Sequence, residues 1–150
     1  MSKLYEYINY LLPSGLAWLF SQIIKCIICG FKKEKKDMFA AGGMPSAHTA
    51  VVIALVTRLF FTVGFGSPVF AIAFVYMIMT IFDSANVRLM TGYQSIEINR
   101  MMNDLYRDKP EEIKALKVVK GHTYPEIVVG GIIGLLLTVA FQIIEQSLLK

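Results

Sequence analysis

The stretch IVVGGIIGLLLTVAF (residues 127–141) contains no charged side chain, and the apolar run to which it belongs continues to residue 149. Three other apolar runs cover residues 11–31, 45–63 and 68–87. Each run is close to the ~20 residues that a helix needs to cross a bilayer. We therefore expect an all-α fold, an integral membrane helical bundle of about four spanning helices.

The composition agrees with a membrane protein. The chain is 55% hydrophobic and 17% charged, with a mean hydropathy of +0.56, whereas soluble domains are ~45–50% apolar and ~25% charged. Its 150 residues suggest a single membrane-embedded domain, 1–150. A soluble bundle with an apolar core is the alternative. The net charge of +4 does not indicate nucleic acid binding, because the lysines flank apolar runs without interleaved aromatic residues.

The stretch 92–120 is polar and of mixed charge. Ile96, Met101, Met102 and Leu105 recur in it at roughly helical spacing. We expect part of this stretch to form an amphipathic helix at the membrane interface.

Three polar motifs flank the apolar runs. GGMPSAH (42–48) precedes the second run, DSANVR (83–88) closes the third, and GHTYPE (121–126) opens the fourth. Because the first and third connections of a four-span bundle lie on the same side of the membrane, the three motifs should meet there.

The distribution of basic residues predicts which side this is. Loops on the motif side hold ten lysines and arginines against three on the other: Lys32, Lys33, Lys35, Lys36, Arg100, Arg107, Lys109, Lys114, Lys117 and Lys120, against Lys3, Arg58 and Lys150. The excess predicts a multi-pass protein of the cell membrane whose motif side is cytoplasmic. We expect Arg58 to reach the aqueous phase on the opposite side.

The first motif has the features of an anion site at a helix start. Gly43 can turn backbone N–H groups inward, and Ser46 is a good N-cap. A helix N-terminus attracts phosphate, and His48 can exchange a proton near pH 7. A capped helix start with an incidental histidine is the alternative.

The third motif allows two interpretations. Thr123 and Glu126 fit a capping box, which is purely structural. His122 and Glu126 are also four residues apart, so the carboxylate could hold one ring nitrogen and leave the other free to attack.

Charged residues within the apolar runs need partners. Lys25 lies inside the first run, and Asp83 and Arg88 lie near the end of the third. They could form structural charge pairs, or Lys25 and Arg88 could form a cationic pocket for a phosphoryl group. Asp83 and Glu126 have the character of orienting groups, so we expect neither a metal nor a cofactor.

The three motifs, with TGYQ (91–94) after the second, resemble the divergent branch of the type-2 phosphatidic acid phosphatase and vanadium haloperoxidase superfamily, and the resemblance covers nearly the whole chain. It implies that His48 is the general acid and that Ser46 contacts phosphate. It also implies that His122 is the nucleophile, with Glu126 replacing the usual orienting aspartate.

The sequence departs from the superfamily pattern at two positions. No R-P pair is present, and Lys25 is our candidate for the lysine of that motif. Leu116 stands where an arginine normally precedes the nucleophile, and Arg88, Lys117 or Lys120 could substitute for it.

We therefore expect a metal-independent phosphatase that hydrolyses a membrane lipid phosphate or diphosphate, polyprenyl or phosphatidate-type, through a phosphohistidine on His122. Lys25, Gly43, Ser46 and Arg88 would bind the phosphoryl group. The alternative is a membrane protein that binds or transports a lipid phosphate without cleaving it. The bilayer would surround the protein, and the GxxxG pair Gly130 and Gly134 would pack helices closely and could join two copies.

Overall fold

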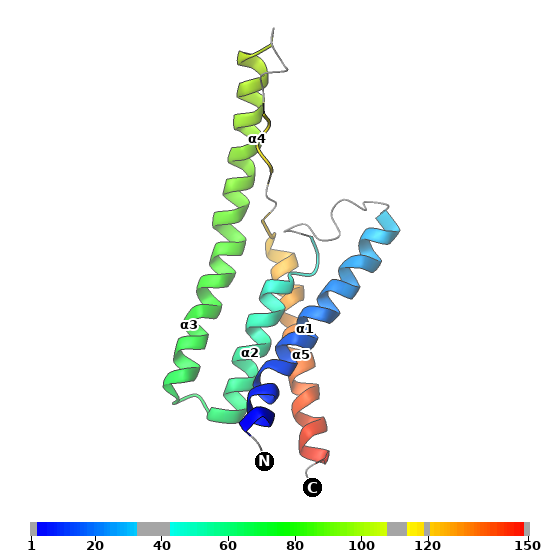
Figure 1. Cartoon of the computed structure of the whole chain (residues 1–150), viewed down its shortest axis with the longest axis vertical. Helices are drawn as coiled ribbons and strands as arrows, with labels where there is room; N and C mark the ends of the chain where they lie inside the picture. The colour runs from blue at the N-terminus through cyan, green and yellow to red at the C-terminus, as the bar shows by residue number, and fades with distance from the viewer. Residues whose placement is uncertain (1–2, 33–42, 108–113, 119–120, 149–150) are drawn as a thin grey trace.

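The computed structural model describes residues 3–32, 43–107, 114–118 and 121–148. These residues form helices without any strand, which confirms the all-α prediction (Figure 1). In chain order the elements are α1 (Lys3–Lys32), α2 (Ala47–Val63), α3 (Pro68–Phe82), the π-helical turn η2 (Asp83–Val87), α4 (Arg88–Leu105) and α5 (Tyr124–Leu148).

Within the described residues, three helical segments are long and apolar enough to cross a membrane: Ile8–Ile28, Pro68–Leu105 and Tyr124–Leu148. The remaining expected span, the second along the chain (45–63), corresponds to α2, which is apolar but has only 17 residues. α2 is the central helix, because it packs against α1, α3 and α5. The bundle is thus built around a short helix that begins at the first polar motif.

Glycines on α5 allow it to approach α2 closely. A Cβ atom on Gly130 would collide with the carbonyl oxygen of Ser46, and one on Gly134 would collide with that of Ala50. The predicted close helix packing is therefore confirmed. Both glycines are buried, and α2 covers their face. A contact between two copies through these glycines stays a prediction.

The stretch expected to form an interfacial helix is helical, as α4, but it continues the third span directly, and its place at the membrane interface stays a prediction. The Asp83 N–H donates to the carbonyl oxygens of both Met79 and Thr80, and the π-helical turn carries α3 directly into α4. The two helices form one long rod (Figure 1). Its 38 residues correspond to about 57 Å at ~1.5 Å per residue, well beyond the ~30 Å hydrocarbon core. α4 therefore extends the third span out of the bilayer.

The end of α2 far from the motifs holds a buried polar cluster, the Arg58 cluster (Asn9, Arg58, Gln142 and Glu145). Arg58 is only 2% exposed and pairs with Glu145, with Nη1 2.6 Å from Oε2. Its Nε donates to the Asn9 carbonyl oxygen at 3.2 Å, and Nη1 donates to the Gln142 side chain. The expectation that Arg58 reaches water is therefore wrong, because α1 and α5 supply its partners inside the bundle.

Candidate functional site

The three polar motifs meet at one end of the bundle, as their positions between the apolar runs predicted. The His122 N–H donates to the Ser84 carbonyl oxygen at 3.1 Å, which joins the third motif to the second. The Ser46 N–H donates to the Glu126 carbonyl oxygen at 3.0 Å, which joins the first to the third. The starts of α2 and α5 lie beside η2 through these two bonds.

The two histidines of the chain are neighbours at this junction. His48 lies in the first turn of α2, and His122 lies two residues before α5 begins. Their ring centroids are 6.3 Å apart. His122 is only 4% exposed, whereas His48 is exposed. One imidazole is thus held inside the protein while the other can meet water.

Glu126 fixes the orientation of His122. Its Oε2 lies 3.0 Å from the His122 Nδ1 and also accepts the Thr123 N–H at 3.2 Å. The carboxylate therefore performs both functions that the sequence allowed, capping the start of α5 and holding the imidazole. With Nδ1–H donating to the carboxylate, Nε2 keeps a free electron pair for attack.

The environment of His122 favours its neutral form. Burial is the largest influence and lowers the pKa of His122 below its ordinary value, whereas the hydrogen bond and the charge of Glu126 act to raise this pKa. The charges of Lys25 and Arg88 lower the pKa further, because both cations lie near the ring. A neutral imidazole is the form that can act as a nucleophile.

The predicted cations differ in their surroundings. Lys25 is only 5% exposed, and its Cε lies 3.9 Å from where a Cβ atom on Gly43 would be. Gly43 has a φ of 83°, which favours glycine. Arg88 is 43% exposed, and its Nε donates to the Asp83 Oδ2 at 2.6 Å. Asp83 thus orients Arg88, as expected of a supporting residue.

Three predicted residues remain: Ser46, Lys117 and Lys120. Ser46 is fully buried, and its Oγ accepts hydrogen bonds from the Thr49 N–H and Oγ1–H, so its visible function is to cap α2. Lys117 is exposed in the segment 114–118. Lys120 lies outside the described residues. Phosphate contacts by these three side chains stay predictions.

Comparisons with known proteins agree with the motifs. The model of the family described as "Divergent PAP2 family" matches residues 8–137, which include all three motifs and all five α-helices in whole or in part. The chain belongs to the divergent PAP2 family. It is also 37% identical to the "Uncharacterized membrane protein YuiD" of Bacillus subtilis (strain 168), over 85% of this chain and 90% of that protein. No solved structure matches significantly.

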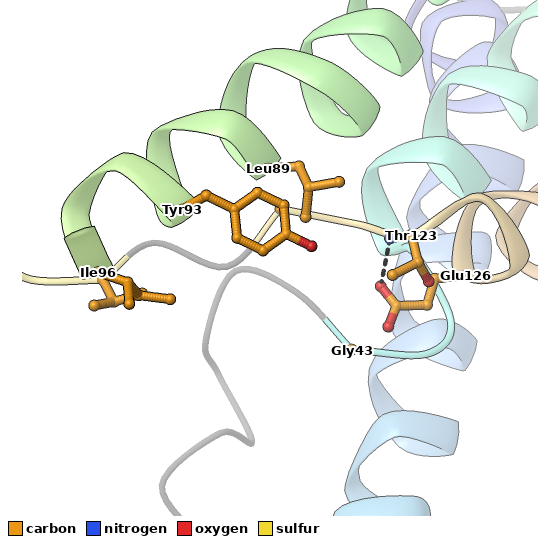
Figure 2. Close-up of a pocket in the computed structure, with 9 residues that line it drawn as sticks. Gly43, Leu89, Tyr93, Ile96, Thr123 and Glu126 are labelled. Atoms are coloured by element: carbon orange, nitrogen blue, oxygen red, sulfur yellow. Dashed lines mark hydrogen bonds between the residues drawn. The ribbon is translucent and has the colours of Figure 1, made fainter.

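The site of this divergent PAP2 member also contains residues that the sequence analysis missed. Ser84, in η2, is 3% exposed, and its Oγ has no hydrogen-bond partner in the structure. A cavity of about 230 Å³ beside Glu126 is lined by Gly43, Leu89, Gly92, Tyr93, Ile96, Val118, Gly121, Thr123 and Glu126 (Figure 2). The recurrence of Leu89, Tyr93 and Ile96 at helical spacing directly after the second motif is the signal that could have identified its apolar wall.

Proposed function

We propose that this divergent PAP2 protein is a membrane phosphatase that hydrolyses a lipid phosphate or diphosphate through a phosphohistidine on His122. The observation that carries the proposal is the arrangement of the two imidazoles. His122 is buried and held by Glu126, and the exposed His48 lies 6.3 Å away, centroid to centroid. That spacing suits a nucleophile and a proton carrier that act on opposite sides of one phosphorus atom.

In the first step, the His122 Nε2 attacks phosphorus in line with the ester oxygen. A P–N bond forms, the P–O bond to the leaving alcohol breaks, and His48 gives that oxygen a proton. Lys25 and Arg88 balance the charge on the non-bridging oxygens, which is the principal protein contribution in phosphoryl transfer.

In the second step, His48 accepts a proton from water, and the resulting hydroxide attacks the phosphohistidine. The P–N bond breaks, free phosphate forms, and His122 returns to its neutral state. Acid–base help of this kind typically contributes ~10²–10⁴ in rate. The exposure of His48 supports this assignment, because the second step needs access to water.

Phosphate release by the purified protein tests the proposal. The panel is a phosphatidate, a polyprenyl phosphate and a polyprenyl diphosphate, assayed in chelator with His122→Ala as the control. We expect release from at least one lipid, inhibition by vanadate and none by the chelator. Activity that disappears in chelator and returns with magnesium would contradict the chemistry.

A second candidate function is binding or transport of a lipid phosphate without cleavage. It is favoured by Leu116, which replaces the motif arginine. The Leu116 backbone N–H donates to Asn99 Oδ1 at 2.7 Å, and Asn99 Nδ2 donates to the Leu116 carbonyl oxygen at 2.9 Å. α4 thus holds this segment in place without an arginine in it. Saturable binding of the lipid phosphates without release of phosphate would support this function over hydrolysis.

We further propose that the site faces the cytoplasm, because basic loop residues are concentrated on its side. Lys117 is exposed there. In a cysteine-free background, Lys117→Cys should resist an impermeant thiol reagent in intact cells and react after lysis. Labelling in intact cells would reverse the orientation.

A further inference from the structure

The cavity beside Glu126 has an apolar wall and a polar end. α4 contributes Leu89, Tyr93 and Ile96, and the polar end contains Thr123 and Glu126. Figure 2 shows Leu89, Tyr93 and Ile96 in order along α4. The Tyr93 ring points toward the start of α5, where the Thr123 N–H bonds to the Glu126 carboxylate, and Ile96 lies farther along the wall. The cavity can therefore contact the apolar part of a ligand along α4 and a polar part near Thr123 and Glu126.

The polar end of the cavity is shared with the histidine site. Glu126 lines the cavity, and its Oε2 is 3.0 Å from the His122 Nδ1. Gly43 also lines the cavity and lies next to the Lys25 side chain. A molecule held in the cavity would thus lie on the Glu126 side of His122 and beside the loop at Gly43.

The size and opening of the cavity indicate what part of a ligand it holds. Its volume of about 230 Å³ is below the ~300–1,000 Å³ of sites that enclose a whole small molecule. Tyr93 is 58% exposed and Ile96 is 49% exposed, so the wall continues onto the open surface of α4. A chain longer than the cavity could leave along that surface.

A glycine keeps the cavity narrow. A Cβ atom on Gly121 would collide with the backbone nitrogen of Leu89, so only glycine lets this segment lie directly against α4. The His122 N–H, one residue later, bonds to the Ser84 carbonyl oxygen at 3.1 Å. These two contacts therefore fix the position of His122 relative to the apolar wall on α4.

We propose that this cavity binds part of the apolar chain of the substrate, and that Tyr93 and Ile96 determine the preference for long-chain phosphate esters. The inference rests on the proposed function. Each buried methylene should strengthen binding about fourfold, until the chain passes beyond the cavity.

Ile96 and Ile98 provide a matched pair for the test. Both are on α4 and similarly exposed, at 49% and 43%, but only Ile96 lines the cavity beside Glu126. The probes are hexadecyl phosphate and ethyl phosphate, which share the same reacting group. The purified parent, Ile96→Trp and Ile98→Trp are compared in one detergent, so that micelle partitioning is common to all three.

Tryptophan at position 96 should fill the cavity. We expect Ile96→Trp to raise the KM for hexadecyl phosphate about tenfold more than that for ethyl phosphate, and Ile98→Trp to leave the ratio of the two KM values at the parent level. The proposal is overturned if Ile96→Trp leaves the ratio unchanged, or if both variants change it equally.

Failure of the proposed function would give a different result. If the parent hydrolyses neither ester, the phosphatase proposal fails. Equilibrium binding of hexadecyl phosphate to the same three proteins then decides the cavity proposal. Binding about tenfold weaker only in Ile96→Trp supports it, and equal binding by all three, or none by the parent, overturns it.

Discussion

The two ends of α2 hold two charged clusters that are built differently. In the Arg58 cluster, the guanidinium is 2% exposed and bonds to Glu145, Gln142 and the Asn9 carbonyl oxygen. Its Cζ also lies over the Phe141 ring, 5.2 Å from the ring centre. Nothing in this arrangement offers a surface to a ligand.

The histidine site at the other end is open. His48 is exposed, Arg88 is 43% exposed, Glu126 borders a cavity, and the buried Ser84 hydroxyl has no partner. A buried charge inside a membrane bundle must be paired, and the Arg58 cluster meets this requirement within the chain. The comparison teaches that burial and charge are common to both clusters and do not identify a functional site. Accessible groups and groups without a partner distinguish the histidine site from the Arg58 cluster. Substitutions at one end should change stability, and those at the other should change chemistry.

The largest effect is expected from Glu145→Ala. It leaves the buried Arg58 without its carboxylate, which should lower the free energy of unfolding in detergent by about 3–5 kcal/mol. The double variant Arg58→Met, Glu145→Leu should recover most of this loss, because no buried charge remains. Denaturation of the purified proteins measures both, and a single variant as stable as the parent would show that the pair is not buried in the membrane protein.

Glu126→Gln should change turnover and leave stability nearly unchanged, in contrast to Glu145→Ala. Loss of the charge that holds His122 should lower turnover by about 10²-fold through misorientation, with little change in stability. Because Glu126 raises the pKa of His122, its removal should lower that pKa further. The neutral imidazole then persists to lower pH. The acid limb of the pH–rate profile should therefore shift to lower pH.

The control for this prediction is Glu97→Gln, at an exposed position of α4. It should leave the acid limb where it is in the parent. A shift of the acid limb to higher pH in Glu126→Gln would mean that the carboxylate does not act on His122 as the structure indicates.

Gly130→Ala should lower the free energy of unfolding by about 1–3 kcal/mol. The new methyl group would collide with the Ser46 carbonyl oxygen, which belongs to backbone. Gly131→Ala is the matched control, because its Cβ would meet side chains and not backbone: the flexible end of Ile53, at 2.8 Å from Cδ1, and the Thr49 Cγ2 at an ordinary 3.8 Å. Equal losses in the two variants would argue against the close packing of α5 on α2.

Ser84→Ala should have the smallest effect. Removing a buried hydroxyl without a partner should raise the free energy of unfolding slightly, by no more than about 1 kcal/mol. Ser95→Ala is the contrast, because the Ser95 Oγ donates to the Thr91 carbonyl oxygen at 2.8 Å and that bond would be lost. If Ser84→Ala is the more destabilised of the two, the Ser84 hydroxyl has a partner in the working protein.

The sequence was sufficient to predict where the motifs meet. The apolar runs set the number of crossings, and the crossings place GGMPSAH, DSANVR and GHTYPE on one side. The four-residue spacing of His122 and Glu126 predicted their contact, because local spacing on a chain entering a helix determines it.

Contacts between distant helices were not predictable in the same way. Arg58 is paired by residues from α1 and α5, and nothing local distinguishes it from a cation that reaches water. The joining of α3 to α4 was missed because the π-helical turn at Asp83 contains neither proline nor glycine to mark it. The Ser46 side chain was assigned to phosphate, and only the packing of α5 shows how deeply it is buried.

The central claim is that His122 carries the phosphoryl group and His48 only moves protons. It is tested most directly by brief incubation with labelled p-nitrophenyl phosphate, whose leaving group needs no protonation, followed by an alkaline quench that preserves phosphohistidine. The account predicts that label accumulates on His48→Ala, where no base activates water, and is absent from His122→Ala. Label on His122→Ala, or an unlabelled His48→Ala beside an active parent, would contradict it.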